Sequence, residues 1–325
     1  MTRCSHLSVC ARRLGIGIMA ASALAAGSFA GAASAAPLTP MNIAMVTSMD
    51  TEPYMYAKQQ GYYKDVGLDV TLSTTDSGPA IATGVINGTY DAAAAAAFPI
   101  LIAISRGAPL RIMPGVTTVG PGVGNSGLVV KADSPIKNYK DLVGKTVATN
   151  ALTSLTTLAT KLGVKQEGGN PDGIHFVSLP FKSSLQAVAR GQAAAAVVIS
   201  PFETEAEING MKVISDPIGT MMPKGSPYNI MFTSVKNAKS KAKEFAAFHE
   251  ATARAVKELK ADPALQRKLA VSLMGMSKKV AEKTLLPAYD AGPINLPQFQ
   301  KYADDIAEFG YTKAPVHVAD VVINP

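Results

Sequence analysis

Short apolar runs alternate with longer helical segments along most of this chain, and this alternation restricts the fold more than any other feature. The run from Met41 to Val46 is a predicted buried strand, and the segment from Pro53 to Gln60 after it is a predicted helix. A strand over 68–74 and a helix over 78–87 repeat the unit. Strands that alternate with helices are typical of α/β proteins with mainly parallel sheets. We therefore expect an α/β fold.

Two segments interrupt this alternation. The first, from Thr117 to Gly127, is dense in glycine, and the second, from Pro223 to Pro227, reads PKGSP. Such compositions suit flexible connections. We therefore predict two lobes joined by two hinge crossovers, with a ligand cleft where strand ends of both lobes meet. The predicted boundaries are 36–124 and 228–325 for the first lobe and 125–227 for the second.

The first 35 residues have the three parts of a secretory signal peptide. Arg3, Arg12 and Arg13 form a basic front, an apolar run of small residues follows over 14–31, and Ala33 to Ala35 read A-S-A. A membrane anchor is the alternative, but the run is rich in Ala and Gly, and no later stretch reaches the ~20 apolar residues of a span. We predict a signal peptide over 1–35 that is cleaved near Ala35, and a periplasmic location.

The composition of the remaining chain excludes several function classes. Three of the 31 Lys and Arg lie in the predicted leader, so 28 basic residues remain against 24 acidic ones, a net charge of +4. These charges are scattered, and we expect no nucleic-acid partner. Cys4 and Cys10 also lie in the leader, which excludes disulfides and thiol nucleophiles from the mature protein. The remaining histidines lack metal-ligand spacing. We expect no metal, no cofactor and no catalytic residue.

Four segments resemble the nitrate/sulfonate/taurine-type solute-binding proteins of ABC importers, a family that also includes binders of a thiamine pyrimidine precursor. The most specific is YMYAKQQGYYKDVGLDV, from Tyr54 to Val70. Segments 77–112, 134–149 and 185–201 continue the likeness in the same order. One departure is the run AAAAVV, where the family usually carries an Asp before a strand of the second lobe.

This resemblance implies a type II-like, two-lobed periplasmic-binding-protein fold without catalytic turnover. The expected function is capture of a small-molecule solute by lobe closure and its delivery to an ABC permease in the inner membrane, and we expect a monomer. One alternative is an exported sensor module that presents solute to a receptor. Another is a pyrimidine-biosynthesis enzyme on the same fold, although the chemistry of that relative uses cysteines that the predicted mature chain lacks.

Two predicted helix starts carry candidate ligand contacts. Ser77 is placed to cap a helix, and Gly78 lets the backbone approach a ligand there. In the second lobe, Asn150 follows a strand, and Thr153 or Ser154 is placed to cap the next helix. Each of these residues reads equally well as a plain helix cap.

Loops at strand ends supply the other candidates, although a single aromatic residue in such a loop belongs to the core more often than to a site. Lys182 would pair with a carboxylate or sulfonate, whereas Asp50 would favour an amine. We predict a sulfonate, an aromatic or other organic acid, or a pyrimidine-like solute. The loop candidates are Ser48, Met49, Asp50, Tyr54, Phe98, Pro99, Phe181, Lys182, Ser200, Phe202 and Tyr228.

Overall fold

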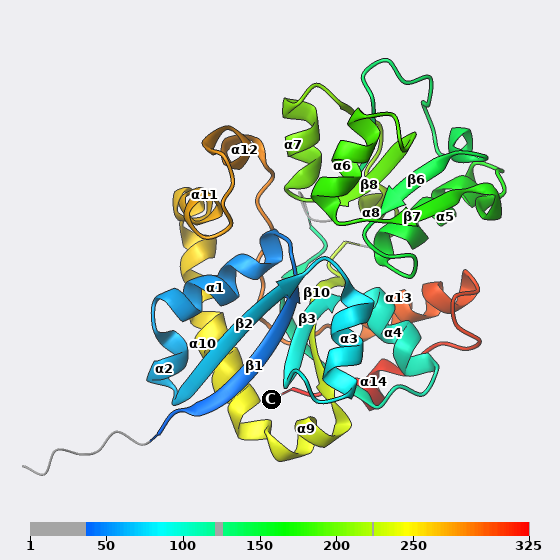
Figure 1. Ribbon diagram of the computed structural model, residues 1–325. Helices are drawn as coiled ribbons and strands as arrows, with labels where there is room; N and C mark the ends of the chain where they lie inside the picture. Colours follow the sequence, from blue (N-terminus) through cyan, green and yellow to red (C-terminus); the bar gives the residue numbers. More distant parts are fainter. Residues whose placement is uncertain (1–36, 121–125, 223, 325) are drawn as a thin grey trace, which may run out of the picture. The chain divides into compact units, whose positions relative to one another are not determined.

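Two five-stranded sheets organise this protein (Figure 1). The computed structural model describes residues 37–120, 126–222 and 224–324. The predicted signal peptide lies outside the described residues. Below, the first lobe is the first sheet with the helices packed on it, and the second lobe is the second sheet with its helices.

The first sheet has the strand order β2-β1-β3-β10-β4. Strand β1 runs parallel to β2 and β3, whereas β10 runs antiparallel to both of its neighbours. The central strand β3 is a run of alanines, which are poor strand formers. Its register places Ala93 beside Phe232 and Ala94 beside Met231, so these small residues of β3 lie opposite large residues of β10. The bounds are β1 Thr39–Val46, β2 Leu68–Thr75, β3 Ala92–Ala96, β4 Leu110–Thr118 and β10 Pro227–Ser234.

The second sheet repeats this topology with the order β7-β6-β8-β5-β9. Strand β6 runs parallel to β7 and β8, and β5 runs antiparallel to β8 and β9. Both sheets are therefore mixed rather than mainly parallel as the sequence suggested. The bounds are β5 Ser126–Val130, β6 Thr146–Thr149, β7 His175–Ser178, β8 Ala195–Ile199 and β9 Lys212–Val213.

In each sheet, the strand that runs antiparallel to its neighbours is the first strand that the chain forms after it crosses from the other lobe. The chain leaves β4 of the first lobe for β5 of the second, and later returns into β10. The two crossovers also bind one another, because Val119 N donates to Ser226 O over 2.8 Å and Gly225 N donates to Val119 O. The ends of the predicted glycine-rich connection, Thr117 and Gly127, are strand residues instead, and residues 121–125 lie outside the described residues.

Helices cover both faces of the first sheet. Alternate residues of β1 point to opposite faces, so Met41 and Ile43 pack under α1, α2 and α10, and Ala44 packs toward α3, α4 and α13. The residues on the apolar side of α10 are buried, and the ring of its Phe248 stacks on Tyr63 at 4.8 Å. The bounds are α1 Glu52–Gln59, α2 Tyr62–Asp65, α3 Gly78–Ile86, α4 Ala97–Ser105, α9 Val235–Ser240, α10 Ala242–Ala261, α11 Pro263–Ser272, α12 Lys278–Lys283, α13 Leu296–Glu308 and α14 Val318–Val321.

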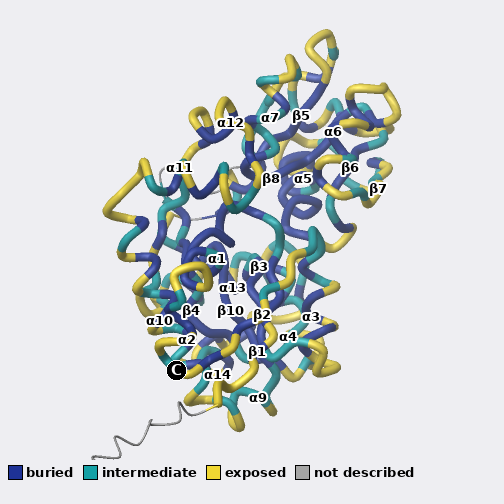
Figure 2. Tube along the Cα trace, turned by 60° about the vertical axis from the view of Figure 1, so that its left-hand side comes forward, coloured by how far each residue is buried: buried dark blue, intermediate teal, exposed yellow. Residues whose placement is uncertain are grey.

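The second lobe is smaller but is built in the same way, and the inner strands β3, β10, β5 and β8 lie in the buried interior (Figure 2). A single 3-10 turn, Lys140–Leu142, precedes β6. Two further 3-10 turns are Met49–Thr51 and Pro171–Gly173. The helical bounds are α5 Leu155–Gln166, α6 Phe181–Ala189, α7 Phe202–Ile208 and α8 Pro217–Met221.

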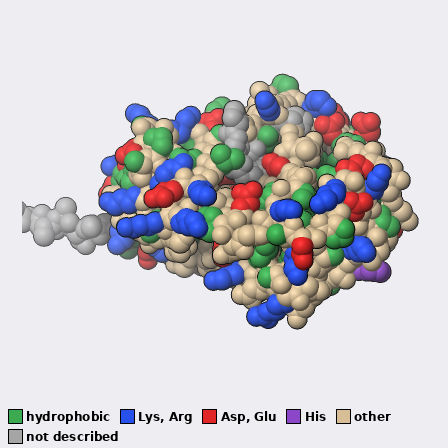
Figure 3. Space-filling view, turned by 90° about the horizontal axis from the view of Figure 1, so that it is seen from above, with side chains coloured by type: hydrophobic (Ala, Val, Ile, Leu, Met, Phe, Trp, Pro, Cys, Tyr) green, Lys and Arg blue, Asp and Glu red, His purple; other side chains and the backbone are tan. Residues whose placement is uncertain are grey.

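The distribution of charge and the polarity of the helices agree with the composition. Lys and Arg side chains are interspersed with Asp and Glu over the face seen in Figure 3. Within the described part of the chain, every helix is too short or too polar to cross a membrane.

Candidate functional site

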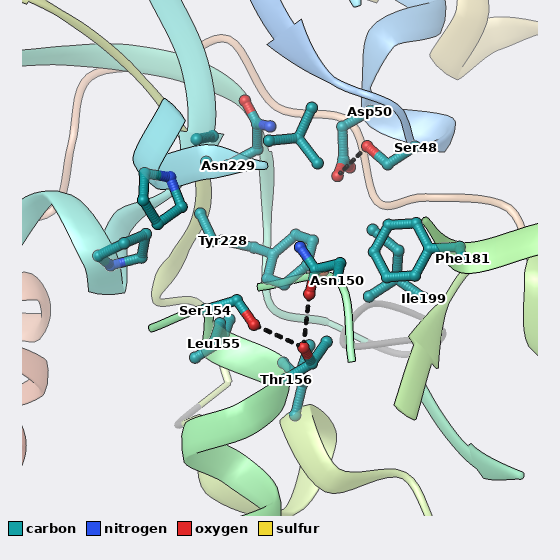
Figure 4. Close-up of a pocket in the computed structure, with 17 residues that line it drawn as sticks. Ser48, Asp50, Asn150, Ser154, Leu155, Thr156, Phe181, Ile199, Tyr228 and Asn229 are labelled. Atoms are coloured by element: carbon teal, nitrogen blue, oxygen red, sulfur yellow. Dashed lines mark hydrogen bonds between the residues drawn. The ribbon is translucent and has the colours of Figure 1, made fainter. Parts of the chain in front are cut away.

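A cavity of about 50 Å³ lies where the strand ends of the two sheets face each other (Figure 4). Parallel strands present their carboxyl ends at this edge, and the antiparallel β10 presents its first residues there, so loops and strand ends from both lobes meet. The first lobe contributes Val46, Ser48, Asp50, Gly78, Pro79, Ala95, Ala96, Pro99, Tyr228 and Asn229. The second lobe contributes Asn150, Ser154, Leu155, Thr156, Phe181, Ile199 and Ile218.

The polar group of the first lobe is a buried carboxyl. Asp50 is only 6% exposed and follows β1 in a 3-10 turn. Its Oδ2 accepts a 3.1 Å hydrogen bond from the hydroxyl of Ser48. Burial raises the pKa of Asp50 to about 6, and the hydroxyls of Thr117 and Ser48 offset part of this rise. Asp50 can therefore accept a proton or a hydrogen bond near neutral pH.

The polar group of the second lobe is an amide held by hydroxyls. Thr156 Oγ1 donates a 2.7 Å hydrogen bond to Asn150 Oδ1, and lies 2.8 Å from Ser154 Oγ. Ser154 also caps α5 by accepting from Thr157 N. Figure 4 shows this chain of contacts below the ring of Tyr228. The amide of Asn150 is thus oriented before any solute arrives.

Helix starts surround the cavity. Gly78 and Pro79 begin α3, Pro99 lies in the first turn of α4, Leu155 begins α5, and Phe181 begins α6. First-turn N–H groups have no acceptor inside their own helix and carry the positive end of the helix dipole. Among the described residues that line the cavity there is no Lys or Arg, and the ionisable side chains are Asp50 and Tyr228. Helix starts, rather than charged side chains, are therefore the positive groups among the described lining residues.

Half of the predicted site residues line this cavity. They come from six separate chain segments of both lobes, as the strand-end interpretation requires. They are Ser48, Asp50, Gly78, Pro99, Asn150, Ser154, Phe181 and Tyr228.

Three predicted contacts belong to the core of the protein instead. Met49 packs with Ala270 in a separate apolar cluster. Tyr54 stacks on Phe248 of α10 at 5.9 Å, and the ring of Phe98 meets the edge of Tyr311. Each of these side chains follows the buried face of its helix or turn, which points away from the cleft.

The other five predicted contacts also lie off the cavity. Ser77 caps α3 through Ala80 N, and Thr153 is exposed. Ser200 is buried and does not line the cavity. Lys182 and Phe202 line a neighbouring cavity of about 360 Å³, because α6 turns Lys182 outward from Phe181.

The lining residues that the sequence did not suggest are mostly apolar residues at strand ends, for which position was the available signal. Thr156 and Ile218 had no such signal, since the first looks like an ordinary helix residue and the second belongs to a helix that the pattern does not show. The residues missed are Val46, Pro79, Ala95, Ala96, Leu155, Thr156, Ile199, Ile218 and Asn229.

The arrangement offers several groups that can bind a small polar molecule. Within the described ranges, no three His, Cys, Asp or Glu side chains gather as a metal site would require. The cavity presents one carboxyl, two amides and several hydroxyls between apolar walls. Such a set can hold a small polar molecule through hydrogen bonds.

Solved structures with the same fold include binding proteins and an enzyme. The alkanesulfonate-binding protein SsuA from Xanthomonas axonopodis pv. citri, bound to MOPS, is 19% identical over 90% of this chain and 100% of its own, with a TM-score of 0.73. The periplasmic nitrate-binding protein NrtA from Synechocystis PCC 6803 is 14% identical over 88% and 86%, with a TM-score of 0.69. The desulfurization enzyme DSZB is 13% identical over 88% and 96%, with a TM-score of 0.60.

These likenesses confirm the predicted periplasmic-binding-protein fold. A comparison with curated proteins gives no match. The family described as NMT1/THI5 like matches residues 48–265, which is more than half of the chain and includes residues from both lobes. This match agrees with the family that the motifs after Tyr54 indicated. The chain therefore belongs to the NMT1/THI5-like family.

Proposed function

We propose that this protein is the extracytoplasmic solute-binding component of an ABC importer. The observation that supports it most directly is the cavity with walls from both lobes. A solute that contacts both walls stabilises the closed arrangement, so binding and closure are coupled. In this proposal the leader is cleaved near Ala35, and the monomeric protein delivers its solute from the periplasm to a permease in the inner membrane.

The proposed lobes are 36–124 with 228–325, and 125–227. The two crossovers act as the hinge, and their mutual hydrogen bonds at Val119 keep them side by side while the lobes move. The solute enters when the lobes separate. One buried water needs about 10–15 Å³. The cavity of about 50 Å³ therefore holds roughly three to five water-sized groups. A ring of six atoms therefore requires a somewhat wider cleft.

The solute class follows from the charges around the cavity. An ionised Asp50 repels an anion, and no lysine or arginine among the described lining residues compensates. A neutral solute with N–H donors instead satisfies Asp50, while its body packs between the rings of Tyr228 and Phe181. This favours a pyrimidine-like solute over a sulfonate, an organic acid or nitrate. No bond is broken in this function.

A titration calorimetry screen tests the proposal. The compounds are 4-amino-5-hydroxymethyl-2-methylpyrimidine, ethanesulfonate, benzoate and nitrate, each added to the wild type at pH 7. We expect saturable binding of the pyrimidine, with at least a tenfold loss in Asn150→Ala because a polar side chain of the cavity wall is removed. Thr153→Ala is the matched control, since Thr153 is exposed nearby but does not line the cavity. Binding that is equally insensitive to both substitutions would place the solute elsewhere.

A further inference from the structure

One residue of the first lobe bonds to two elements of the second. Asp76 lies in the loop between β2 and α3. Its side-chain Oδ2 accepts a hydrogen bond of 3.2 Å from Phe181 N, at the start of α6. Its backbone carbonyl accepts a hydrogen bond of 2.6 Å from Asn150 Nδ2, at the end of β6. Neither bond can persist when the lobes separate.

The start of α6 lacks a cap from its own lobe. The residue before the helix is Pro180, which makes no side-chain capping bond. Aspartate is among the best N-cap residues, because its carboxylate accepts from first-turn N–H groups and interacts favourably with the helix dipole. Asp76 therefore supplies to α6, from the other lobe, the cap that the sequence before Phe181 does not provide.

The role of Asp76 is separable from the stability of its own lobe. The cap of α3 is the neighbouring Ser77, whose Oγ accepts from Ala80 N at 3.3 Å. On the opposite side of the cleft, Asn150 is already oriented by the hydroxyl of Thr156. The two donors that bond to Asp76, Phe181 N and Asn150 Nδ2, are thus positioned by the second lobe itself.

We propose that Asp76 is a positioning residue that holds the cleft closed without touching the solute. It stabilises the closed state by capping α6 and by accepting from Asn150, and so it holds Phe181 and Asn150 of the second lobe against the first lobe. It also occupies the α6 start, which excludes an anionic solute group from that helix end. This inference rests on the proposed lobe closure but not on the identity of the solute.

The test measures the distance between the lobes with no solute present. Nitroxide labels are attached at Thr83→Cys on α3 and Gln166→Cys on α5, both exposed, in a full chain with Cys4→Ser and Cys10→Ser. Pulsed electron spin resonance then gives the distance distribution. In Asp76→Ala we expect the ratio of open to closed molecules to rise roughly three- to tenfold, since a charge-assisted hydrogen bond across the cleft is lost.

Two variants complete the experiment. Asp76→Asn keeps a side-chain acceptor without the charge, so its open fraction should lie between those of the wild type and Asp76→Ala. Ser77→Ala removes the cap within the first lobe and should leave the distance distribution of the wild type. Circular dichroism melting confirms that each variant is folded. An unchanged distribution in Asp76→Ala, or an equal opening in Ser77→Ala, overturns the proposal. Because no solute is added, failure of the compound screen does not affect this outcome.

Discussion

The hydroxyl of Tyr289 donates a 2.5 Å hydrogen bond to Glu52 Oε2 inside the protein. This contact joins the chain after α12 to the start of α1, and the same hydroxyl lies 3.1 Å from Met49 O. Glu52 is fully buried. Burial raises its pKa to about 8, and the hydrogen bond from Tyr289 offsets part of this rise. Glu52 is therefore protonated in the folded protein at neutral pH.

This raised pKa predicts a loss of stability with rising pH. The unfolded chain releases the Glu52 proton near pH 4.5, whereas the folded protein keeps it until about pH 8. The contribution is thus fully present below pH 4.5 and is lost as the pH rises through 8. Glu52→Gln should reduce this loss of unfolding free energy by the share of Glu52, about 2–3 kcal/mol between pH 5 and 7. Urea unfolding at several pH values measures it.

Tyr289→Phe is the matched control for that experiment. It removes the hydrogen-bond donor but keeps the buried carboxyl, so the variant should be less stable than the wild type and retain the pH slope. A wild type whose unfolding free energy is flat between pH 5 and 8 would contradict the assignment of Glu52 as a buried neutral acid.

The raised pKa of Asp50 predicts that the affinity for solute depends on pH. Its pKa is about 6 in the cavity without solute. A neutral solute that donates to the carboxylate should bind about tenfold more weakly at pH 5 than at pH 7, because the protonated carboxyl loses its charge. An anionic solute should show the opposite trend. Calorimetry of the pyrimidine and ethanesulfonate across this range distinguishes them.

The variant Asp50→Asn distinguishes the titration of Asp50 from the titration of the solute in that measurement. Any pH dependence that persists in Asp50→Asn belongs to the solute's own titration and is subtracted. If the wild type and the variant have the same pH profile for every compound that binds, Asp50 does not contact the solute.

Much of the fold could be predicted because local patterns determine it. The alternation of strands and helices predicts the α/β class, and Gly- and Pro-rich segments marked both crossovers. The mixed sheets could not be predicted, since the direction of β5 and β10 depends on which lobe the chain enters from. The contact between Tyr289 and Glu52 joins residues 237 positions apart, and nothing local to either one indicates it.

The site could be predicted to the level of chain segments but not of side chains. Strand ends pointed to the stretch from Ser48 to Asp50, yet only tertiary packing decides that Met49 enters the core between two residues that line the cavity. The same holds for Phe98 and Pro99 in the first turn of α4. Asp76 gave no signal at all, because its partners belong to the other lobe.

Gly115 is predicted to be irreplaceable for a steric reason. It lies in β4 where the pairing with β10 shifts register around Asn229. An added Cβ would lie 2.0 Å from the carbonyl oxygen of Asn229, which belongs to the backbone and cannot turn aside. Gly115→Ala should therefore move the start of β10, with Tyr228 and Asn229, and destabilise the fold by about 1–3 kcal/mol. Thermal unfolding of the variant checks this, and an unchanged melting temperature would show that β10 can shift freely.

Gly78 makes the converse prediction, because a methyl group there fits the fold but enters the solute space. An added Cβ would contact Ala95, Pro99 and Val46 at 3.7 to 3.8 Å, which is ordinary packing, and all three line the cavity. Gly78→Ala should keep the wild-type melting temperature, since alanine favours the helix. It should weaken pyrimidine binding at least tenfold, because the methyl group takes space from a cavity of about 50 Å³. Calorimetry and melting curves together separate the two effects: weaker binding with a lowered melting temperature indicates general damage, and unchanged binding means that the solute does not reach the start of α3.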